Sequence, residues 1–547
     1  MKSTLLPYYV TQRDKAAPVT APVPADPDLP RTCVIGAGSA GLACAKNLYL
    51  AGVPFDCFEK GSRIGGNWLI DNPNGVSACY DHLEINTSVR RMAFSDFPMP
   101  ADYPPYARHD QVAAYFDDYA EHFGLLPLIT FDTEVTAVEP VEPVERDGDA
   151  AGEPGAAGAA GTAGSAGNAD GAGEVRGTGR WRVTTRGPEG EVTRDYDAVI
   201  VCNGHHWDPR LPDPAYPGQD EFAGEQIHAH SYRDASQLAG RDVVVVGAGN
   251  SALDIASAAA RTADSATISQ RRGQWVIPKY TAGIASDLIA VPGWAPWLLN
   301  RIRLRVSSWT VRGLDKWGLP RPAHAPSQSH PVQSEEIRDA LDSGRLNPKG
   351  AIERFDAGHV HFKDGTSVRA DLVVWATGYR TTFPFLDESL VSARDNDLPL
   401  WKRAVRPDLP GLYFVGLLQP IGAVMPLAEA QAEWITEILT GAYAFPDRGE
   451  IEASMRRDHE RNKSRFYDSA RHTMEVDFDS FLFDLARERR RGRRRRRREQ
   501  AGVLTAGGGR PGAGGRGSGR GSGRSGASGL RPGTVGRRLV AAAGRTR

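Results

Sequence analysis

Short apolar runs followed by glycine turns recur along the chain and predict two copies of one α/β unit. In the first copy, the run Cys33 to Ile35 enters a glycine turn, a helical stretch follows, and a second apolar run spans Phe55 to Phe58. In the second copy, Val243 to Val246 and Ala266 to Ser269 flank a turn and a helix in the same order. Continuous apolar strands separated by helices are typical of parallel sheets that are covered on both faces. We therefore expect an α/β chain with two Rossmann-like domains.

The first turn has the spacing of a dinucleotide-binding site. Gly36, Gly38 and Gly41 form Gly-x-Gly-x-x-Gly between the strand and the helix. These glycines allow a tight turn, close approach of a pyrophosphate and close packing of helix on strand, and the helix N-terminus supplies amide donors. Glu59 ends the next strand, where a carboxylate can accept from both hydroxyls of a ribose. The alternative is a glycine-rich turn without a ligand.

The second turn differs in the residues that follow its second strand. The variant spacing Gly-x-Gly-x-x-Ala is made by Gly247, Gly249 and Ala252. No acid ends the next strand, which runs instead into Gln270, Arg271 and Arg272. A carboxylate there would repel a 2′-phosphate, whereas guanidinium groups bind it bidentately. We expect NADP at this site with Arg271 or Arg272 on the phosphate; a solvated arginine pair at a strand end is the alternative.

One acidic and one basic site on the same chain predict two different dinucleotides. The simplest assignment is FAD at the first site and NADPH at the second, because electrons then pass from nicotinamide to flavin. Two further strand ends agree with it. The turn with Thr377 and Gly378 follows the run Leu372 to Trp375, and Cys202-Asn203-Gly204 follows Ala198 to Val201. Such turns close over the dinucleotide sites of two-domain flavoproteins.

These sites predict that one domain is inserted into the other. Residues 31–206 are expected to form the first part of a FAD-binding domain, 207–335 an NADP-binding domain, and 336–484 the return of the FAD-binding domain with C-terminal helices. Three low-complexity segments are predicted to be disordered, namely the Pro- and Ala-rich lead-in 1–30, the Gly/Ala-rich segment 147–180 and the Arg/Gly-rich tail 485–547. The sequences on either side of 147–180 alternate like strands, so this segment is expected to expand a hairpin loop.

Charge and cysteine content narrow the class of protein. The net charge of −1 hides a basic tail, because residues 485–547 contain 19 Arg and 2 Glu. This tail has no aromatic residue for stacking on bases, which disfavours nucleic acid as a partner. No apolar run reaches the roughly 18 to 20 residues of a membrane-spanning helix. The five cysteines include no Cys-x-x-Cys pair, so we expect a cytoplasmic protein without a metal site.

Together the motifs resemble the flavin-containing monooxygenase family of class B flavoprotein monooxygenases. The segment Phe222-x-Gly224-x-x-x-His228-x-x-x-Tyr232 is similar to the identifying motif of this family. The resemblance runs from about Arg31 to about Gly441. Other similar segments are Gly65-Gly66-x-Trp68, Asn86-Thr87-Ser88, Gly204-His205-His206, Ala376-Thr377-Gly378-Tyr379, Gly416-x-x-Gln419-Pro420-x-Gly422 and Pro426-x-x-Glu429-x-Gln431.

The resemblance implies an NADPH- and O2-dependent oxidoreductase. In such enzymes a C4a-hydroperoxyflavin transfers one oxygen atom to a soft nitrogen or sulfur of a small amine or sulfide. Baeyer–Villiger monooxygenases, which insert oxygen next to a ketone, are the alternative. They typically have Trp where Tyr232 stands, so the resemblance places this chain on the N- and S-oxygenating side. A flavin-binding protein whose basic tail binds nucleic acid is an alternative of another class. A homodimer is compatible with the resemblance.

The family pattern also assigns roles to single residues. It places Asn86 beside flavin and nicotinamide, where an amide can donate without being a strong acid; a helix cap is the alternative for Asn86. His228 is expected to hold the linker between the domains. The residues that the pattern adds to the cofactor sites are Gly66, Trp68, Thr377, Gly378 and Gln419. A core tryptophan is an equal alternative for Trp68.

Substrate identity is not readable from the sequence. The pockets of the family are shaped by the variable segment that corresponds to Val276 to Ser334. Its tryptophans are Trp294, Trp297, Trp309 and Trp317. An aromatic surface of this kind fits a bulky organic amine or sulfide, and it equally fits packing of the NADP domain.

Overall fold

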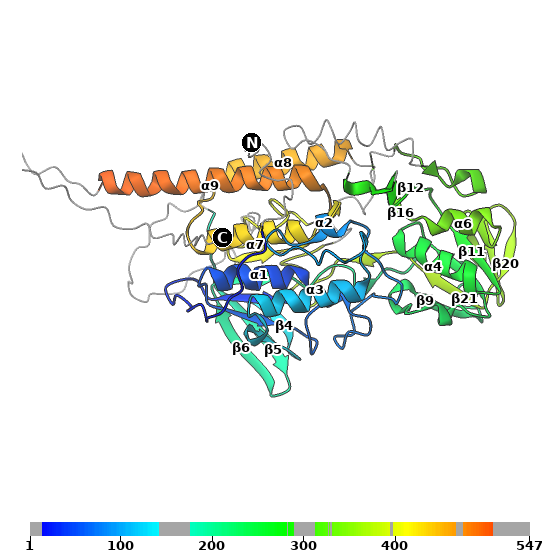
Figure 1. Ribbon diagram of the computed structural model, residues 1–547, viewed down its shortest axis with the longest axis horizontal. Coiled ribbons are helices and arrows are strands. Elements are labelled where there is room, and N and C mark those ends of the chain that lie inside the picture. The colour runs from blue at the N-terminus through cyan, green and yellow to red at the C-terminus, as the bar shows by residue number, and fades with distance from the viewer. Residues whose placement is uncertain are drawn as a thin grey trace, which may run out of the picture. The chain divides into compact units, whose positions relative to one another are not determined.

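The structure is a computed structural model, and its described residues are 14–141, 175–281, 283–288, 312–325, 328, 331–393, 398–465 and 474–506. Contacts divide the chain into two units, residues 1–499 and residues 500–547. The first unit contains two five-stranded parallel sheets, each with helices on one side (Figure 1). This architecture confirms the predicted pair of Rossmann-like domains.

The first sheet has the strand order β23-β7-β1-β2-β3, and all neighbouring strands are parallel. Its strands are β1 (Thr32–Ile35), β2 (Phe55–Phe58), β3 (Ile129–Thr130), β7 (Ala198–Val201) and β23 (Leu412–Phe414). The helices that share a buried core with one face of this sheet include α1 (Ser39–Leu50), α3 (His109–His122) and α7 (Met425–Leu439). An antiparallel sheet packs on the other face and consists of β4 (Glu134–Pro140), β5 (Trp181–Gly187) and β6 (Gly190–Tyr196). We call this part of the chain the FAD half, after the cofactor that the sequence predicts for it.

The second sheet repeats this plan with the order β17-β11-β10-β21-β9. Its strands are β9 (Glu225–His228), β10 (Asp242–Val246), β11 (Ser265–Ser269), β17 (Leu346–Lys349) and β21 (Leu372–Trp375). Helices α4 (Asn250–Thr262) and α6 (Glu336–Asp342) cover one face. The antiparallel strands on the other face are β18 (Ile352–Phe355), β19 (His359–Phe362) and β20 (Ser367–Arg369). We call this part the NADP half, again after the cofactor that the sequence predicts for it.

The burial of the central strands explains why they are apolar at every position. Along β10, Val243 and Val245 face the core under α4, whereas Val244 and Val246 face the core under the antiparallel sheet. A strand that is covered on both faces has no solvent side, so its sequence does not alternate. The same division holds for β1, where Val34 faces one core and Cys33 faces the other.

Two expectations about the chain path can be compared with these sheets. Strands β4 and β5 are antiparallel with Pro140 opposite Trp181, which confirms the hairpin on either side of the Gly/Ala-rich segment; residues 142–174 lie outside the described residues. The second sheet takes β17 and β21 from beyond the expected domain boundary at residue 335. The parallel sheet requires them, because β10 pairs with β21 and β11 pairs with β17.

The expected lead-in 1–30 is partly ordered. Residues 14–30 run along the FAD half, where the amide of Ala16 donates to the carbonyl of Asp96 at 2.8 Å. Backbone pairing of this kind fixes a segment that has few apolar residues of its own. Residues 1–13 lie outside the described residues.

The basic tail also differs from the expectation of disorder from residue 485 onward. Helix α9 runs from Phe478 to Ala506. Within the first unit, Arg489 forms ion pairs with Glu433 and Glu437 of α7. Carboxylates on α7 therefore neutralise arginines that look unpaired in the sequence. Residues beyond α9 lie outside the described residues.

The remaining elements connect these layers. The other α-helices in the described ranges are α2 (Val89–Met92) and α8 (Arg448–Arg465). The other strands are β8 (Asp208–Pro209), β12 (Trp275–Ile277), β13 (Tyr280–Thr281), β14 (Ile284–Ala285), β15 (Arg312–Gly313), β16 (Val332–Gln333), β22 (Tyr379–Arg380), β24 (Gln419–Ile421) and β25 (Glu475–Asp477). Among the helices that the structure describes, none has both the length and the apolar character that crossing a membrane requires.

Candidate functional site

The glycine turn between β1 and α1 leaves no space for side chains at two of its three glycines. A Cβ on Gly41 would lie 1.8 Å from the carbonyl oxygen of Gly36. A Cβ on Gly36, whose φ is +97°, would lie 2.9 Å from the carbonyl oxygen of Cys202 at the end of β7. Helix α1 begins after Gly38, and no described side chain caps its first turn. Its first amides are therefore open to an anion such as a pyrophosphate.

The carboxylate of Glu59 lies against the same turn. Glu59 is 4% exposed. Its Oε2 accepts a hydrogen bond from the amide of Ala37 at 2.7 Å, and its Oε1 accepts one from the amide of Gly61 at 2.9 Å. The side-chain amide of Asn74 also donates to Oε1, at 3.3 Å. The structure thus brings the predicted acid to the predicted turn and adds Asn74, which no motif indicated.

Two further glycines pack against this turn. The amide of Gly65 donates to the carbonyl of Ala37 at 3.4 Å, and a Cβ on Gly66 would lie 3.2 Å from the Cα of Gly38. Trp68 follows them, is half-buried, and packs on the hydrophobic core of the FAD half. This position agrees with the core alternative for Trp68, and its contact with a cofactor stays a prediction.

The second turn has the same geometry at the corresponding strand ends. A Cβ on Gly247 would lie 2.3 Å from the carbonyl oxygen of Ala376, which follows β21. The methyl group of Ala252 fits at the third position, 3.1 Å from that hypothetical Cβ. No described atom lies within 4 Å of a Cβ on Gly249, and no described side chain caps α4, which begins after it. This turn also offers uncapped amides at a helix N-terminus.

One buried and two exposed side chains follow β11. Gln270 is 1% exposed, and neither atom of its carboxamide makes a hydrogen bond with a described residue. Arg271 and Arg272 are exposed. Both guanidinium groups therefore stand at the edge of the sheet that carries the second turn. Their contact with a 2′-phosphate stays a prediction.

The two segments that connect the halves pair with each other. Strands β8 and β22 are antiparallel. The hydroxyl of Thr377 donates to the carbonyl of Arg210 at 2.5 Å, and the side-chain amide of Asn203 donates to the carbonyl of Thr382 at 3.1 Å. The hydrogen bond of Thr377 therefore ties the connecting segment that contains β22 to the connecting segment that contains β8. Gly378, whose φ is +89°, allows the chain to turn directly after it.

Asn86 lies where the FAD half meets the variable segment. On one side of it, the ammonium of Lys279 pairs with Glu84 at 2.6 Å. On the other side, the amide and the hydroxyl of Ser88 donate to the carboxylate of Asp287 at 2.7 and 2.8 Å. Asn86 itself is half-buried. The residue that precedes α2 is Ser88, so the helix-cap alternative for Asn86 is wrong.

The segment Gly416 to Gln431 forms a strand end and a helix start, as expected. The side-chain oxygen of Gln431 accepts from the amide of Gly416 at 3.1 Å. Gly422 has φ +139°, and a Cβ there would lie 3.0 Å from the Cβ of Phe478 in α9. The group that approaches Gly422 closely in the structure is therefore a side chain of the protein itself, that of Phe478. Gln419 begins β24 and is half-buried; its contact with a cofactor stays a prediction.

The sequence matches a known family over most of its length. Residues 30–150 and 168–489 match the flavin-binding monooxygenase-like family. The chain belongs to this family. It is 32% identical over 477 residues to flavin-containing monooxygenase 5 of Rattus norvegicus, a match that covers 83% of this chain and 82% of the relative. It is 31% identical to dimethylaniline monooxygenase (N-oxide-forming) 2 of the same organism, with 84% and 82% covered.

Solved structures of related enzymes have the same fold as this family member. The S-allyl-L-cysteine S-oxygenase of Allium sativum has a TM-score of 0.59 at 24% identity and covers 87% of this chain and 93% of its own. The NADP+-bound cyclohexanone monooxygenase of Rhodococcus sp. Phi1 has a TM-score of 0.57 at 16% identity, with 84% and 97% covered. At these identities the likeness concerns the fold alone.

Family membership makes the protein a flavoprotein monooxygenase that uses FAD and NADPH. The two turns fit these cofactors. Each turn leads into a helix whose first amides have no side-chain cap in the described structure. The acid Glu59 stands at one turn, and the neutral Gln270 with two arginines stands at the other. These two sets of side chains suit a ribose with free hydroxyls and a phosphorylated ribose, respectively.

The histidine of the family motif has a structural role in the described contacts. Nδ1 of His228 accepts from the amide of His230 at 3.0 Å, and its ring meets Tyr379 with centroids 5.2 Å apart. Burial lowers the pKa of His228 to about 4 and also lowers the pKa of His205 and of His230. These rings are therefore neutral at pH 7. This agrees with the expected role of His228 at the linker.

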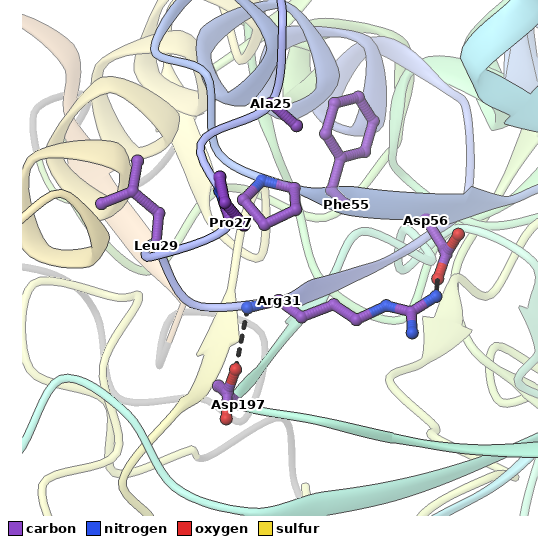
Figure 2. A pocket seen from close by; sticks show the side chains of 8 residues that line it. Ala25, Pro27, Leu29, Arg31, Phe55, Asp56 and Asp197 are labelled. Atoms are coloured by element: carbon purple, nitrogen blue, oxygen red, sulfur yellow. Dashed lines mark hydrogen bonds and ion pairs between the residues drawn. The ribbon is translucent and has the colours of Figure 1, made fainter.

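One hollow of the flavoprotein lies away from the glycine turns (Figure 2). Arg31 lies beside it and pairs with Asp56 at 2.8 Å, while its amide donates to Asp197 at 2.8 Å. The full lining is Ala25, Pro27, Leu29, Arg31, Pro54, Phe55, Asp56 and Asp197. These residues stand at the amino ends of β1, β2 and β7, whereas Gly36 and Glu59 follow the carboxyl ends. The hollow is therefore no part of the dinucleotide site.

Two further predictions concern metal and aromatic residues. Nowhere in the described ranges do three His, Cys, Asp or Glu side chains gather as a metal site requires. Of the tryptophans in the variable segment, Trp317 donates to Asp342 at 2.9 Å and packs beside the core of the NADP half. Trp294, Trp297 and Trp309 lie outside the described residues.

Proposed function

We propose that this monooxygenase transfers one oxygen atom of O2 to a soft nitrogen or sulfur of a small organic substrate. The observation that carries the proposal is the 31% identity, over 84% of this chain, to an enzyme named dimethylaniline monooxygenase (N-oxide-forming). In the balanced reaction, substrate, O2, NADPH and a proton give oxygenated substrate, NADP+ and water. The acceptor atom keeps its other bonds and uses a lone pair to form the new bond to oxygen.

The motif residue Tyr232 supports nitrogen or sulfur oxygenation over ketone oxidation. Tyr232 is fully buried and packs against Tyr80, with ring centroids 5.6 Å apart. Baeyer–Villiger monooxygenases typically have the larger Trp at this place in the motif. Tyr80 in turn donates to Asp254 of α4 at 2.7 Å, so this position belongs to the contact between the two halves.

The roles of single residues follow from their positions. FAD, when bound, supplies the activation of O2. We assign the amides after Gly38 and Gly249 to the two pyrophosphates, Glu59 to the ribose of FAD, and Arg271 with Arg272 to the 2′-phosphate of NADPH.

Asn86 is assigned to the reaction site itself. It stands at the meeting of the FAD half and the variable segment, where a carboxamide can donate a hydrogen bond without releasing a proton. The side chain would then hold a polar atom of the bound cofactors in place while the surrounding protein excludes water.

The test is product analysis with three probes. The yellow FAD-loaded protein is supplied with NADPH and O2 and with N,N-dimethylaniline, S-allyl-L-cysteine or cyclohexanone in separate reactions. We expect an N-oxide or a sulfoxide in amounts close to the NADPH consumed, and no lactone. Lactone formation from cyclohexanone, with the amine and the sulfide left unchanged, would overturn the proposal.

We further propose a cytoplasmic location. All five cysteines are free and buried, and the sulfurs of Cys44 and Cys202 stay 3.7 Å apart, a separation that fits a reducing compartment. Assembly as a homodimer is proposed from the resemblance, and nucleic acid is not proposed as a partner. Sedimentation of the purified protein, alone and with duplex DNA, tests the homodimer and the statement about nucleic acid.

A further inference from the structure

The two glycine-turn sites place different residues at one equivalent position. Strand β2 ends at Phe58 and is followed by Glu59, and strand β11 ends at Ser269 and is followed by Gln270. In each sheet the amide of the first turn glycine donates to the last residue of this strand, at 2.8 Å to Phe58 and at 3.0 Å to Ser269. Gln270 therefore corresponds to Glu59.

Backbone contacts to the next strand confirm this correspondence. The amide of Glu59 donates to Thr130 of β3 at 2.9 Å, and the amide of Gln270 donates to Lys349 of β17 at 3.0 Å. Strand β17 occupies the same place in the second sheet as β3 occupies in the first. Glu59 and Gln270 therefore occupy equivalent backbone positions, between the glycine turn on one side and the next strand of the sheet on the other.

The side chains differ in their contacts. The carboxylate of Glu59 accepts from the amides of Ala37 and Gly61. The carboxamide of Gln270 is 1% exposed, yet neither Oε1 nor Nε2 forms a hydrogen bond with any residue that the structure describes. A buried amide without partners costs free energy of folding. An ordered water or a ligand can supply the missing donor and acceptor, and Gln270 follows β11 beside the second glycine turn, where we assign NADPH.

We propose that Gln270 contacts the adenosine ribose of NADPH and is a determinant of coenzyme specificity. This inference rests on the proposed assignment of NADPH to the second turn. At the position where the FAD half has a carboxylate, the NADP half has a neutral group. Its Nε2 donates to an oxygen of the ribose, and its lack of charge avoids the repulsion that an acid would impose on the 2′-phosphate. Arg271 supplies the positive charge, and Gln270 supplies the hydrogen bond and the neutrality.

Binding measurements separate these two contributions. The oxidised, FAD-loaded protein is titrated calorimetrically with NADP+ and with NAD+, without any turnover. For Gln270→Glu we expect the Kd of NADP+ to rise at least about tenfold while the Kd of NAD+ stays within about threefold, because the new charge faces the phosphate. For Gln270→Leu we expect both Kd values to rise by a similar factor, since the lost hydrogen bond is common to both.

Stability gives a second readout that does not depend on the coenzyme. Leucine removes the unpartnered amide from a buried position, so Gln270→Leu is expected to unfold at the wild-type temperature or above it when no nicotinamide coenzyme is present. The matched control is Gln226→Glu, the same change at an exposed residue of β9, on the far edge of the same sheet. This control should leave both Kd values unchanged.

Several outcomes would overturn the inference. An unchanged ratio of the two Kd values in Gln270→Glu would do so, as would a Gln270→Leu protein that is less stable and binds normally. If the wild-type protein is yellow but binds no NADP+, the coenzyme assignment itself fails. If Arg271→Ala together with Arg272→Ala weakens NADP+ binding and Gln270→Glu does not, only the role of Gln270 fails.

Discussion

The ammonium of Lys46 lies 2.9 Å from the carboxylate of Glu429, and each side chain is only 2% exposed. Lys46 also pairs with Asp96 at 2.9 Å, and the second oxygen of Glu429 accepts from the amide of Ser95 at 2.7 Å. This network joins α1, α7 and the loop that follows α2 in the FAD half. The ammonium and the carboxylate of Glu429 therefore each have two partners inside the core.

Removal of one charge from this network should strongly destabilise the protein. We expect Glu429→Gln to lower the free energy of unfolding by about 3 kcal/mol, because it leaves Lys46 with a single carboxylate in a buried site. Denaturant unfolding followed by flavin fluorescence measures the loss. The matched control is Asp117→Asn, which breaks the exposed pair with Arg63 and should cost less than about 0.5 kcal/mol. Equal losses in the two variants would contradict the prediction.

The close packing at Gly41 predicts that adding a single methyl group at this position causes loss of bound flavin. In Gly41→Ala the Cβ would meet the carbonyl oxygen of Gly36 at 1.8 Å, so the turn must open and the pyrophosphate site is lost. We expect a purified protein with less than about a tenth of the wild-type flavin, measured from its absorbance. Gly358→Ala is the control, since no described atom lies within 4 Å of its Cβ. A fully yellow Gly41→Ala protein would show that the turn tolerates the shift.

Asn86→Ala should uncouple NADPH oxidation from substrate oxygenation. The variant loses the only carboxamide that we assign to the reaction site, so water and protons gain access to the reduced flavin. We expect hydrogen peroxide to account for at least about half of the NADPH consumed, with a kcat for product that is about tenfold lower. Peroxide is measured with a peroxidase assay, with Asn347→Ala as control. A tightly coupled Asn86→Ala enzyme would remove Asn86 from the mechanism.

The buried histidines predict a loss of stability in acid. The pKa of His228 is lowered by burial to about 4, whereas an unfolded chain binds the proton near pH 6.5. The stabilising contribution is therefore complete above about pH 6.5 and declines as the pH falls toward 4. In His228→Gln we expect the free energy of unfolding to decline less steeply between pH 7 and pH 5, by up to about 1.4 kcal/mol per pH unit. Denaturant unfolding at each pH measures the slope, and parallel curves for the two proteins would argue against His228 as a contributor.

Helix α9 should depend on some of its arginines and not on others. Arg489 is 11% exposed in its side chain and pairs with Glu433 at 2.5 Å and with Glu437. Arg491 is exposed, and no ion pair links it to a described residue. We expect Arg489→Ala to speed proteolysis of α9 several-fold and Arg491→Ala to have no effect. Equal cleavage rates in both variants would mean that the ion pairs do not hold the helix.

The repeated plan of the two halves could be predicted from local sequence, because strand, turn and helix follow each other within about 30 residues. The turns Gly36 to Gly41 and Gly247 to Ala252 lie between β1 and α1 and between β10 and α4, as this local order predicts. The order of the outer strands could not be predicted, because β17 joins the second sheet from beyond the variable segment. The contact of Asn74 with Glu59 could not be predicted either, because the residues are 15 positions apart and no motif links them.

The partners of the arginines in the basic tail could not be predicted from local sequence either. A run of arginines with only two acids in the sequence indicates disorder, but Glu433 and Glu437, the partners of Arg489, lie on α7, about 50 residues earlier. The unpartnered carboxamide of Gln270 likewise becomes visible only when burial and hydrogen bonds are known for each atom. The composition of a segment shows which charged and polar groups it has, but only the fold shows which partners those groups contact.

Both passages of the backbone between the halves run through the short ribbon of β8 and β22. A hinge with two strands tied side by side resists sliding of one strand past the other and bends mainly as a unit. With NADPH at the second turn, as we propose, any rotation of the NADP half would therefore move the nicotinamide along a restricted arc relative to the flavin. The hydrogen bonds from Thr377 to Arg210 and from Asn203 to Thr382 tie this ribbon to the adjoining chain and add to that restriction.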